Sequence, residues 1–296
     1  MASAELRDTR RRIKSVQSTM KITRAMELIA ASRIPKATAR VEASKPYSAK
    51  LVEVIRNVSA ASGGASHMLL ERREVKNAGV LIVASDRGLA GAYASSIIRE
   101  AERHIITLER AGTPARLFVI GKKAQSYFQY RKYHIERAFL GVTDTPGYGD
   151  ARAVANILMD SYASQTVDSV DTFYTQYKSP MTQVPLQFQL LPIVSPEAAE
   201  GTEAPASVDY SYEPSPTAIL DRLLPRYVES MVFSMLLEAS ASEHSARRRA
   251  MKAATENADE LIRILTRIAN RARQAEITTE ISEIVGGAEA LSQQTS

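Results

Sequence analysis

The sequence predicts a mixed α and α/β protein, in which a long antiparallel coiled coil of the N- and C-terminal helices carries an inserted α/β domain. Two stretches with helical patterns, 3–59 and 218–285, lie near the ends of the chain and contain no glycine. The segment between them alternates short apolar runs with helical patterns, which is typical of a mainly parallel sheet covered by helices. We therefore expect four parts, listed in chain order as 1–62, 75–195, 196–216 and 217–288.

The composition is that of an ordinary soluble protein, with 45% hydrophobic and 24% charged residues among 296. The absence of cysteine excludes disulfide bonds and a zinc site built on thiolates, and the four scattered histidines argue against a metal enzyme. The longest apolar runs are far shorter than the roughly 20 residues that a membrane-spanning helix needs. Because no secretory signal opens the chain, we expect a cytoplasmic protein that does not cross a membrane.

The N-terminal segment has the alanine, lysine, arginine, glutamate and methionine content of a long helix. Pro35 is expected to kink or interrupt that helix near Ile34, because proline lacks the N–H of the helical hydrogen bond. Ser62-Gly63-Gly64 is expected to end it. Its apolar seam is predicted to drift along the helix through Ile13, Val16, Met20, Ile22, Met26 and Ile29, and then through Leu51, Val54, Ile55 and Val58.

The central segment contains β-branched and aromatic runs that predict strands, separated by helical patterns. No helix separates the last two strands, so we expect an antiparallel hairpin around Ser179-Pro180 at the edge of the sheet. The predicted strands cover 80–83, 117–120, 135–140, 170–177 and 186–194, and the predicted helices cover 93–110, 122–131 and 150–164.

An acidic, proline-rich segment over 196–216 predicts a poorly ordered linker. The stretch beyond it predicts a helix of about 100 Å, far longer than a small domain is wide. Its apolar stripe therefore needs a partner, and the N-terminal helix can supply one in a slender, imperfect antiparallel coil. Gly286-Gly287 is expected to end the helix. The predicted stripe comprises Leu220, Leu223, Leu224, Tyr227, Met231, Met235, Leu261, Leu265, Ile268, Ala272, Ile277, Ile281 and Ile284.

Both ends of the chain are basic. Residues 1–60 contain 13 basic and five acidic residues, and residues 247–273 contain eight basic and three acidic ones. Basic helices of this kind are typical of proteins that bind nucleic acid, an anionic membrane surface or acidic protein partners. Alternatively, the basic residues form a solvated helix face. No aromatic pair of an RNA-recognition domain, KH loop or zinc finger accompanies them, which argues against nucleic acid.

Two central motifs look enzymatic. Asp144-Thr-Pro-Gly147 is similar to a GTPase switch motif, but no phosphate loop accompanies it, so a turn is the better interpretation. Ser85-Asp-Arg-Gly-Leu-Ala-Gly91 follows a predicted strand and opens a helix, yet it lacks the glycine spacing of a dinucleotide site. We therefore predict no catalytic residue, cofactor or metal. A nucleotide-binding α/β enzyme with helical arms and a coiled-coil nucleic-acid binder remain as alternatives.

The two ends of the chain carry the most specific pattern. The stretch from Ile13 to Arg33, IKSVQSTMKITRAMELIAASR, closely resembles the N-terminal helix of the gamma subunits of bacterial F-type ATP synthases. Residues 243–257 and 270–288 resemble the C-terminal helix of that family, with Ile277-Thr-x-Glu280-x-x-Glu283-x-x-x-Gly287-Ala288 as its signature. Ser85-Asp-Arg-Gly-Leu89 resembles its central loop. The resemblance thus covers essentially the whole chain.

This resemblance implies a subunit that performs no chemistry itself. In that family the two terminal helices form the rotor shaft inside a ring of three alpha and three beta subunits. A Rossmann-like domain sits below the ring, against the epsilon subunit and the membrane c-ring, and proton flow turns the shaft to couple transport to ATP synthesis or hydrolysis. The implied location is the cytoplasmic face of the cell membrane, as a peripheral protein with no cofactor and no nucleic-acid partner.

The resemblance also assigns individual residues to contacts with the alpha/beta ring. Met26 matches the methionine that lies against an acidic lever of a beta subunit. Arg273 and Gln274 match a pair that hydrogen-bonds a catch loop. The polar positions that support shaft contacts match Arg247, Gln274, Thr278 and Glu280.

Overall fold

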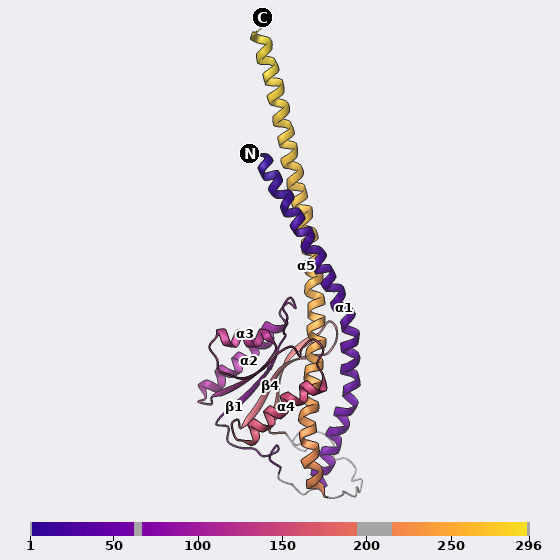
Figure 1. The fold of residues 1–296 in the computed structure, drawn as a ribbon, viewed down its shortest axis with the longest axis vertical. Coiled ribbons are helices and arrows are strands. Elements are labelled where there is room, and N and C mark those ends of the chain that lie inside the picture. The colour runs from indigo at the N-terminus through magenta and orange to yellow at the C-terminus, as the bar shows by residue number, and fades with distance from the viewer. Residues whose placement is uncertain (1, 62–66, 194–214, 295–296) are drawn as a thin grey trace. The chain divides into compact units, whose positions relative to one another are not determined.

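The computed structural model describes residues 2–61, 67–193 and 215–294, which form five helices and five strands (Figure 1). The chain divides into two compact units. One comprises residues 1–29 and 248–296, and the other comprises residues 30–247. Most of the predicted linker over 196–216 lies outside the described residues. None of the helices in the described part of the chain is long and apolar enough to cross a membrane.

Helix α1 (Ala2–Ala61) passes without interruption through Pro35 and Pro46. The predicted interruption near Ile34 is therefore wrong, whereas the predicted kink stays a prediction. A proline removes a single N–H donor from the helical ladder, and the flanking side chains of Ile34 and Val41 are buried, so packing holds the helix on both sides of Pro35. The described helix ends at Ala61, and Ser62-Gly63-Gly64 lies outside the described residues.

Helix α5 (Pro216–Gln294) begins with a serine cap, because the Ser215 hydroxyl oxygen accepts a hydrogen bond from the Ala218 N–H at 3.2 Å. Pro216 then occupies the first helical position, where its missing N–H costs least. The helix continues through Gly286 and Gly287, so the predicted stop there is wrong. Glycine ends a helix when it adopts a left-handed φ, and neither glycine has a positive φ.

The sheet has the strand order β3-β2-β1-β4-β5. Strands β1 to β4 are parallel, and β5 pairs antiparallel with β4 through a turn that contains Ser179 and Thr182. This Rossmann-like arrangement and the edge hairpin are as predicted. The strands are β1 (Ala78–Val83), β2 (Ala115–Ile120), β3 (Ile135–Phe139), β4 (Ser169–Tyr177) and β5 (Gln183–Leu191), and the helices between them are α2 (Tyr93–Arg110), α3 (Lys122–Tyr130) and α4 (Tyr148–Ala163).

Two hydrophobic cores lie on opposite faces of this sheet, because successive strand residues point to opposite sides. Val80 and Ile82 of β1 belong to the core beneath α2 and α3. Leu81 and Val83 belong to the other core, which α4 and the helix pair cover. Residues 51–58 of α1 and 220–239 of α5 contribute the helix-pair side chains to that second core: Leu51, Ile55, Val58, Leu220, Leu224, Val228, Val232, Met235, Leu236 and Ala239.

In the unit of residues 30–247, α1 and α5 run antiparallel. Val41 clusters with Leu237 and Ala241, and the Ser48 hydroxyl lies 3.0 Å from that of Ser230. Pairing thus moves back along α5 as it moves forward along α1, which confirms the predicted direction. Almost every residue of α5 from 235 to 247 is buried. The sheet domain and α1 therefore enclose this part of α5 together.

In the unit of residues 1–29 and 248–296, the seam follows a regular three- and four-residue spacing typical of a left-handed coiled coil. The two helices meet at Thr23 and Thr255, whose hydroxyl oxygens lie 2.8 Å apart. The buried and half-buried seam positions are Leu6, Thr9, Ile13, Val16, Met20, Thr23 and Glu27 of α1, with Met251, Thr255, Ala258, Ile262, Leu265, Ala269, Ala272 and Glu276 of α5.

The predicted seam is therefore wrong at several positions. Ile22 is 58% exposed and Ile284 is 72% exposed, although both were predicted to lie in the seam. The remaining predicted members that are exposed are Ile29, Leu261, Ile268, Ile277 and Ile281. Threonine, alanine and glutamate occupy heptad positions in their place, so a search for large apolar side chains alone selects the wrong stripe.

Candidate functional site: a polar clamp around helix α5

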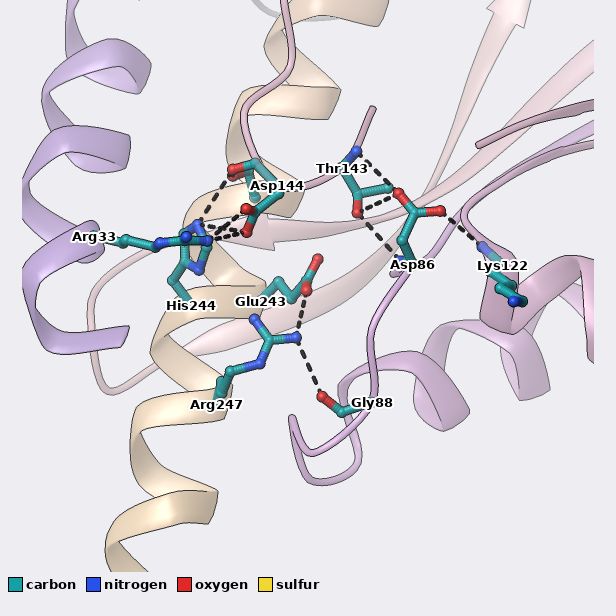
Figure 2. Close-up of polar contacts among 10 residues, drawn as sticks. Arg33, Asp86, Gly88, Lys122, Thr143, Asp144, Glu243, His244 and Arg247 are labelled. Carbon is teal, nitrogen blue, oxygen red and sulfur yellow. Dashed lines mark hydrogen bonds and ion pairs between the residues drawn. The ribbon is translucent and has the colours of Figure 1, made fainter. Parts of the chain in front are cut away.

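The loop between β3 and α4 contacts both long helices through Asp144. One guanidinium nitrogen of Arg33, Nη1, donates to both carboxylate oxygens of Asp144 at 2.5 Å. From α5, the Ser240 hydroxyl donates to the backbone oxygen of Asp144 at 3.0 Å. The His244 Nε2 donates to the same oxygen at 3.3 Å (Figure 2). Arg40 of α1 donates to the backbone oxygen of Pro146 in the same loop. One short loop thus joins the sheet domain to α1 and α5.

The charges of this contact favour an ionised Asp144 beside a neutral His244. Partial burial raises the pKa of Asp144, but the hydrogen bonds and charge of Arg33, with the charge of Arg87 and that of His244 when it is protonated, outweigh burial and hold that pKa below its usual value. Burial lowers the pKa of His244, and the hydrogen bond and charge of Asp144 only partly offset it. Neutral His244 therefore donates its Nε2–H to a backbone carbonyl.

A second contact joins α5 to the loop that follows β1. Arg247 Nη2 lies 2.5 Å from Glu243 Oε1 on the same helix, and it also donates to the backbone oxygen of Gly88 at 3.3 Å (Figure 2). Glu243 is 1% exposed and Arg247 is 7% exposed. Burial raises the pKa of Glu243, and the Arg247 charge opposes that rise. Because an unpaired charge in this position is costly, the two side chains depend on each other.

We call these two contacts the polar clamp, which consists of Arg33, Asp144, Ser240, Glu243, His244, Arg247 and the backbone of Gly88. Its charged groups form ion pairs with one another, Arg33 with Asp144 and Arg247 with Glu243. The polar clamp therefore holds parts of the fold together. No group of three or more acidic or histidine side chains that could hold a metal ion occurs among the described side chains. The arrangement can fix the angle between the sheet domain and residues 216–247 of α5.

The structure places the six sequence-predicted contact residues in different settings. Arg247 is a buried member of the polar clamp. The other five belong to the unit of residues 1–29 and 248–296, where Met26 is half-buried and Arg273, Gln274, Thr278 and Glu280 are exposed. The Thr278 hydroxyl donates to the backbone oxygen of Gln274 at 2.9 Å, which is a contact within the helix. Whether these residues contact partners stays a prediction.

Sequence reasoning missed the clamp residues other than Arg247. Asp144 lies in a loop, as predicted, but nothing in a single sequence pairs that loop with Arg33, which lies 111 residues earlier. The only usable signal was the combination of Ser240, Glu243 and His244 at helical spacing within the C-terminal stripe. Polar residues on a helix face that must be buried require partners elsewhere in the fold.

Comparisons with known proteins agree with this architecture. A family model described as ATP synthase matches residues 5–291. The ATP synthase gamma chain of Kineococcus radiotolerans is 50% identical over 300 residues, covering 98% of this chain and 97% of that protein. The ATP synthase gamma chain of Parafrankia sp. is 47% identical over 293 residues, covering 98% of each.

A solved structure has the same fold. It is the central stalk and c-ring of the mitochondrial ATP synthase of Tetrahymena thermophila, in which the matched chain superposes with a TM-score of 0.60 at 23% identity. The match covers 79% of this chain and 99% of that chain. At this identity the likeness extends to the fold alone. The full-length sequence matches go further, and by them this chain belongs to the gamma chain family of ATP synthases.

Proposed function

We propose that the chain is the rotating central-stalk subunit of an F-type ATP synthase, coupling proton flow through the membrane sector to ATP synthesis or hydrolysis on the alpha/beta ring. As a gamma chain it is a subunit of that complex and is not itself catalytic. The proposed partners are the alpha and beta subunits, the epsilon subunit and the c-ring. The complex is membrane-bound, and we place this subunit at its cytoplasmic face.

Exposed apolar side chains on α1 and α5 support this proposal independently of the family match. Large apolar side chains remain exposed on both helices, at positions that do not belong to the coiled-coil seam between α1 and α5. Contiguous apolar surface on a helix normally marks a contact with another protein. The residues are Ile22, Leu28 and Ile29 of α1, and Leu261, Ile264, Ile268, Ile277, Ile281, Ile284 and Val285 of α5.

The apolar residues near the end of α5 alternate with polar ones that a partner can also contact. Ile277, Ile281 and Ile284 have the three- and four-residue spacing of one helix face, and Arg273, Gln274 and Glu280 lie exposed on the same segment. A surrounding ring of subunits would cover this segment from several sides. Such a ring requires a shaft with an exposed apolar surface on more than one face, which is what both helices present.

Replacement of the exposed apolar face tests the proposal. Ile277→Asp, Ile281→Asp and Ile284→Asp, introduced together, should prevent co-purification of the chain with alpha and beta subunits, because each charge would enter an apolar contact. The chain itself should keep its helical content, since these side chains lie outside its own seam. The control is Leu140→Asp, which alters an exposed apolar side chain of the sheet domain. A triple variant that still assembles with wild-type stoichiometry would contradict the proposed shaft contact.

A further inference from the structure

We propose that Asp86 is a positioning residue that joins the two loops of the polar clamp, so that the sheet domain holds residues 216–247 of α5 as one rigid body. The link between this role and energy coupling rests on the proposed function, whereas the contacts of Asp86 do not. Asp86 lies just after β1, in the Ser85 to Gly91 loop, which lacks the glycine spacing of a dinucleotide site.

The carboxylate of Asp86 accepts hydrogen bonds from the β3–α4 loop and from the first residue of α3. Its Oδ2 accepts from the Gly141 N–H at 3.0 Å and from the Thr143 hydroxyl at 3.0 Å, with the Thr143 N–H at 3.4 Å. Its Oδ1 accepts from the Lys122 N–H at 3.1 Å, at the first residue of α3. The Thr143 hydroxyl oxygen in turn accepts from the Asp86 N–H at 3.2 Å. The three chain segments thus converge on one side chain.

These bonds link the two loops of the sheet domain that contact α5. Thr143 is adjacent to Asp144, which contacts Ser240 and His244, and Asp86 is two residues before Gly88, which contacts Arg247. Figure 2 shows Asp86 and Thr143 on the sheet-domain side of these contacts, with Asp144 and Gly88 reaching toward α5. Without the bonds that join Asp86 to Gly141 and Thr143, each loop would contact α5 independently. With them, displacement of one loop is transmitted to the other.

The backbone at Gly121 brings the start of α3 close to Asp86. Gly121 precedes α3 with φ +94°, and a Cβ there would lie 2.8 Å from the Ala84 carbonyl oxygen, so the end of β1 and the start of α3 approach closely. That approach places Asp86 at the N-terminus of α3, where the helix dipole and a free N–H favour an anion. This is the edge where doubly wound folds bind phosphates. Here the protein's own carboxylate occupies the α3 terminus.

Thr143 offers a substitution that isolates the bond. Thr143 is buried, and its hydroxyl exchanges two hydrogen bonds with Asp86. Thr143→Val removes the hydroxyl and keeps the shape, while Thr143→Ser keeps the hydroxyl. Asp86→Ala removes all contacts of the carboxylate. The matched control is Asp168→Ala, because Asp168 accepts the Lys76 and Asn77 N–H groups at 3.0 Å and contacts neither clamp loop.

The first measurement uses the full chain and needs no assumption about function. Amide hydrogen exchange should accelerate at Gly141 and Lys122 by about tenfold or more in Asp86→Ala, because those N–H groups lose their acceptor. Asp168→Ala should accelerate exchange at Lys76 and Asn77 instead. Unchanged exchange at Gly141 and Lys122 in Asp86→Ala would overturn the assigned contacts.

The second measurement uses the assembled ATP synthase in vesicles and follows the ratio of ATP-driven proton uptake to ATP hydrolysis. We expect Asp86→Ala and Thr143→Val to lower this ratio by about twofold or more, and Thr143→Ser to keep it at the wild-type value. A loosened sheet domain would transmit less of the shaft's rotation to the c-ring, while ATP hydrolysis on the alpha/beta ring would continue. Asp168→Ala should keep the wild-type ratio. If Asp86→Ala does not assemble, the two Thr143 variants decide the question by themselves.

The outcomes separate the two proposals. A wild-type chain that restores no proton uptake to a complex depleted of this subunit contradicts the proposed function. A wild-type chain that restores uptake, beside Thr143→Val with an unchanged ratio, overturns only the positioning role of Asp86. An equal loss of ratio in Asp168→Ala would also overturn it, because a general weakening of the sheet domain would then explain the effect.

Discussion

Arg33 of α1 and Asp144 of the β3–α4 loop form an ion pair in which a single guanidinium nitrogen lies 2.5 Å from each carboxylate oxygen. The pair is only partly exposed, with side-chain exposures of 38% and 29%. Partial shielding makes such a charge-assisted contact stronger than an exposed surface pair and leaves it open to screening by salt. It is also the point where the sheet domain meets α1 by charge rather than by apolar packing.

Asp144→Ala should therefore lower the free energy of unfolding of the chain by about 1–2 kcal/mol, the loss expected for hydrogen bonds to a charged group that is partly screened by water. The loss should shrink as salt is raised. Urea unfolding of the full chain at two salt concentrations measures it. Asp160→Ala, an exposed carboxylate near the end of α4, serves as the control. A salt-independent loss would show that the backbone contacts of the loop matter rather than the ion pair.

A pH dependence follows from His244. Burial holds the pKa of His244 in the folded protein below 6.5, its ordinary value. The folded state therefore binds fewer protons than the unfolded state in this range, and its stability is fully present above pH 6.5 and is lost as the pH falls toward the folded pKa. His244→Gln keeps an amide donor for the Asp144 carbonyl and cannot titrate. The stability advantage of the wild type over His244→Gln should thus shrink as the pH is lowered from 7.5 to about 5.

Comparing the two proteins isolates His244, because titrating groups that do not contact position 244 contribute equally to each. His67, whose pKa burial also lowers, is one such group, and Asp144, Arg33, Arg247 and Glu243 are the charged groups around the site. Urea unfolding at several pH values gives the difference directly. A difference that stays constant from pH 7.5 to about 5 would show that His244 does not titrate in this window.

The sheet domain was largely predictable from the sequence. Predicted and observed helix α2 have the same bounds, 93–110, because its strongly amphipathic pattern is a local property that follows from spacing alone. The hairpin of β4 and β5 was predictable because no helix separates two runs that alternate apolar and polar side chains. Strand β5 begins three residues earlier than predicted, at Gln183, because its first residues pair with Gln176 and Tyr177 across a short turn.

The coiled-coil seam was much less predictable. Thr9, Thr23 and Glu27 of α1 are buried in the described seam, and their polarity hid the heptad pattern to which they belong. The exposed isoleucines of α5 also have helical spacing, so they were predicted as seam positions although they lie outside the seam. The polar clamp was beyond sequence reasoning for a different reason. Arg33, Asp144 and His244 lie on three elements, and only the tertiary structure brings them together.

Gly121 offers a test of the close approach between β1 and α3. Gly121→Ala should lower the free energy of unfolding by about 3 kcal/mol or more, since the new Cβ would meet backbone atoms of Ala84 and Ser85 at 2.8 Å in a conformation that L residues rarely adopt. Gly112→Ala is the matched control. Gly112 has φ +80° but nothing within 4 Å of an added Cβ, so it should cost only the backbone strain, about 1–2 kcal/mol. Equal losses in the two variants would contradict the crowding at Gly121.

The contact proposed for Arg273 and Gln274 tests whether the shaft acts through specific bonds or through shape alone. Both side chains are exposed on α5, and the seam of that segment passes instead through Leu265, Ala269 and Ala272. Arg273→Ala with Gln274→Ala therefore leaves the coil intact. The double variant also leaves unchanged the exposed apolar side chains of Ile268, Ile277 and Ile281.

If Arg273 donates charge-assisted hydrogen bonds to the ring, each is worth roughly 1.5–3 kcal/mol when shielded from water and must form and break as the shaft turns. The double variant should then assemble normally but lower steady-state ATP hydrolysis and synthesis by about tenfold or more, since 1.4 kcal/mol corresponds to a factor of ten. The control is Arg110→Ala with Gln129→Ala, which removes an exposed arginine and glutamine from α2 and α3. Turnover at the wild-type rate in a normally assembled double variant would mean that the shape of the shaft suffices, because no specific bond at this position would then limit the rate.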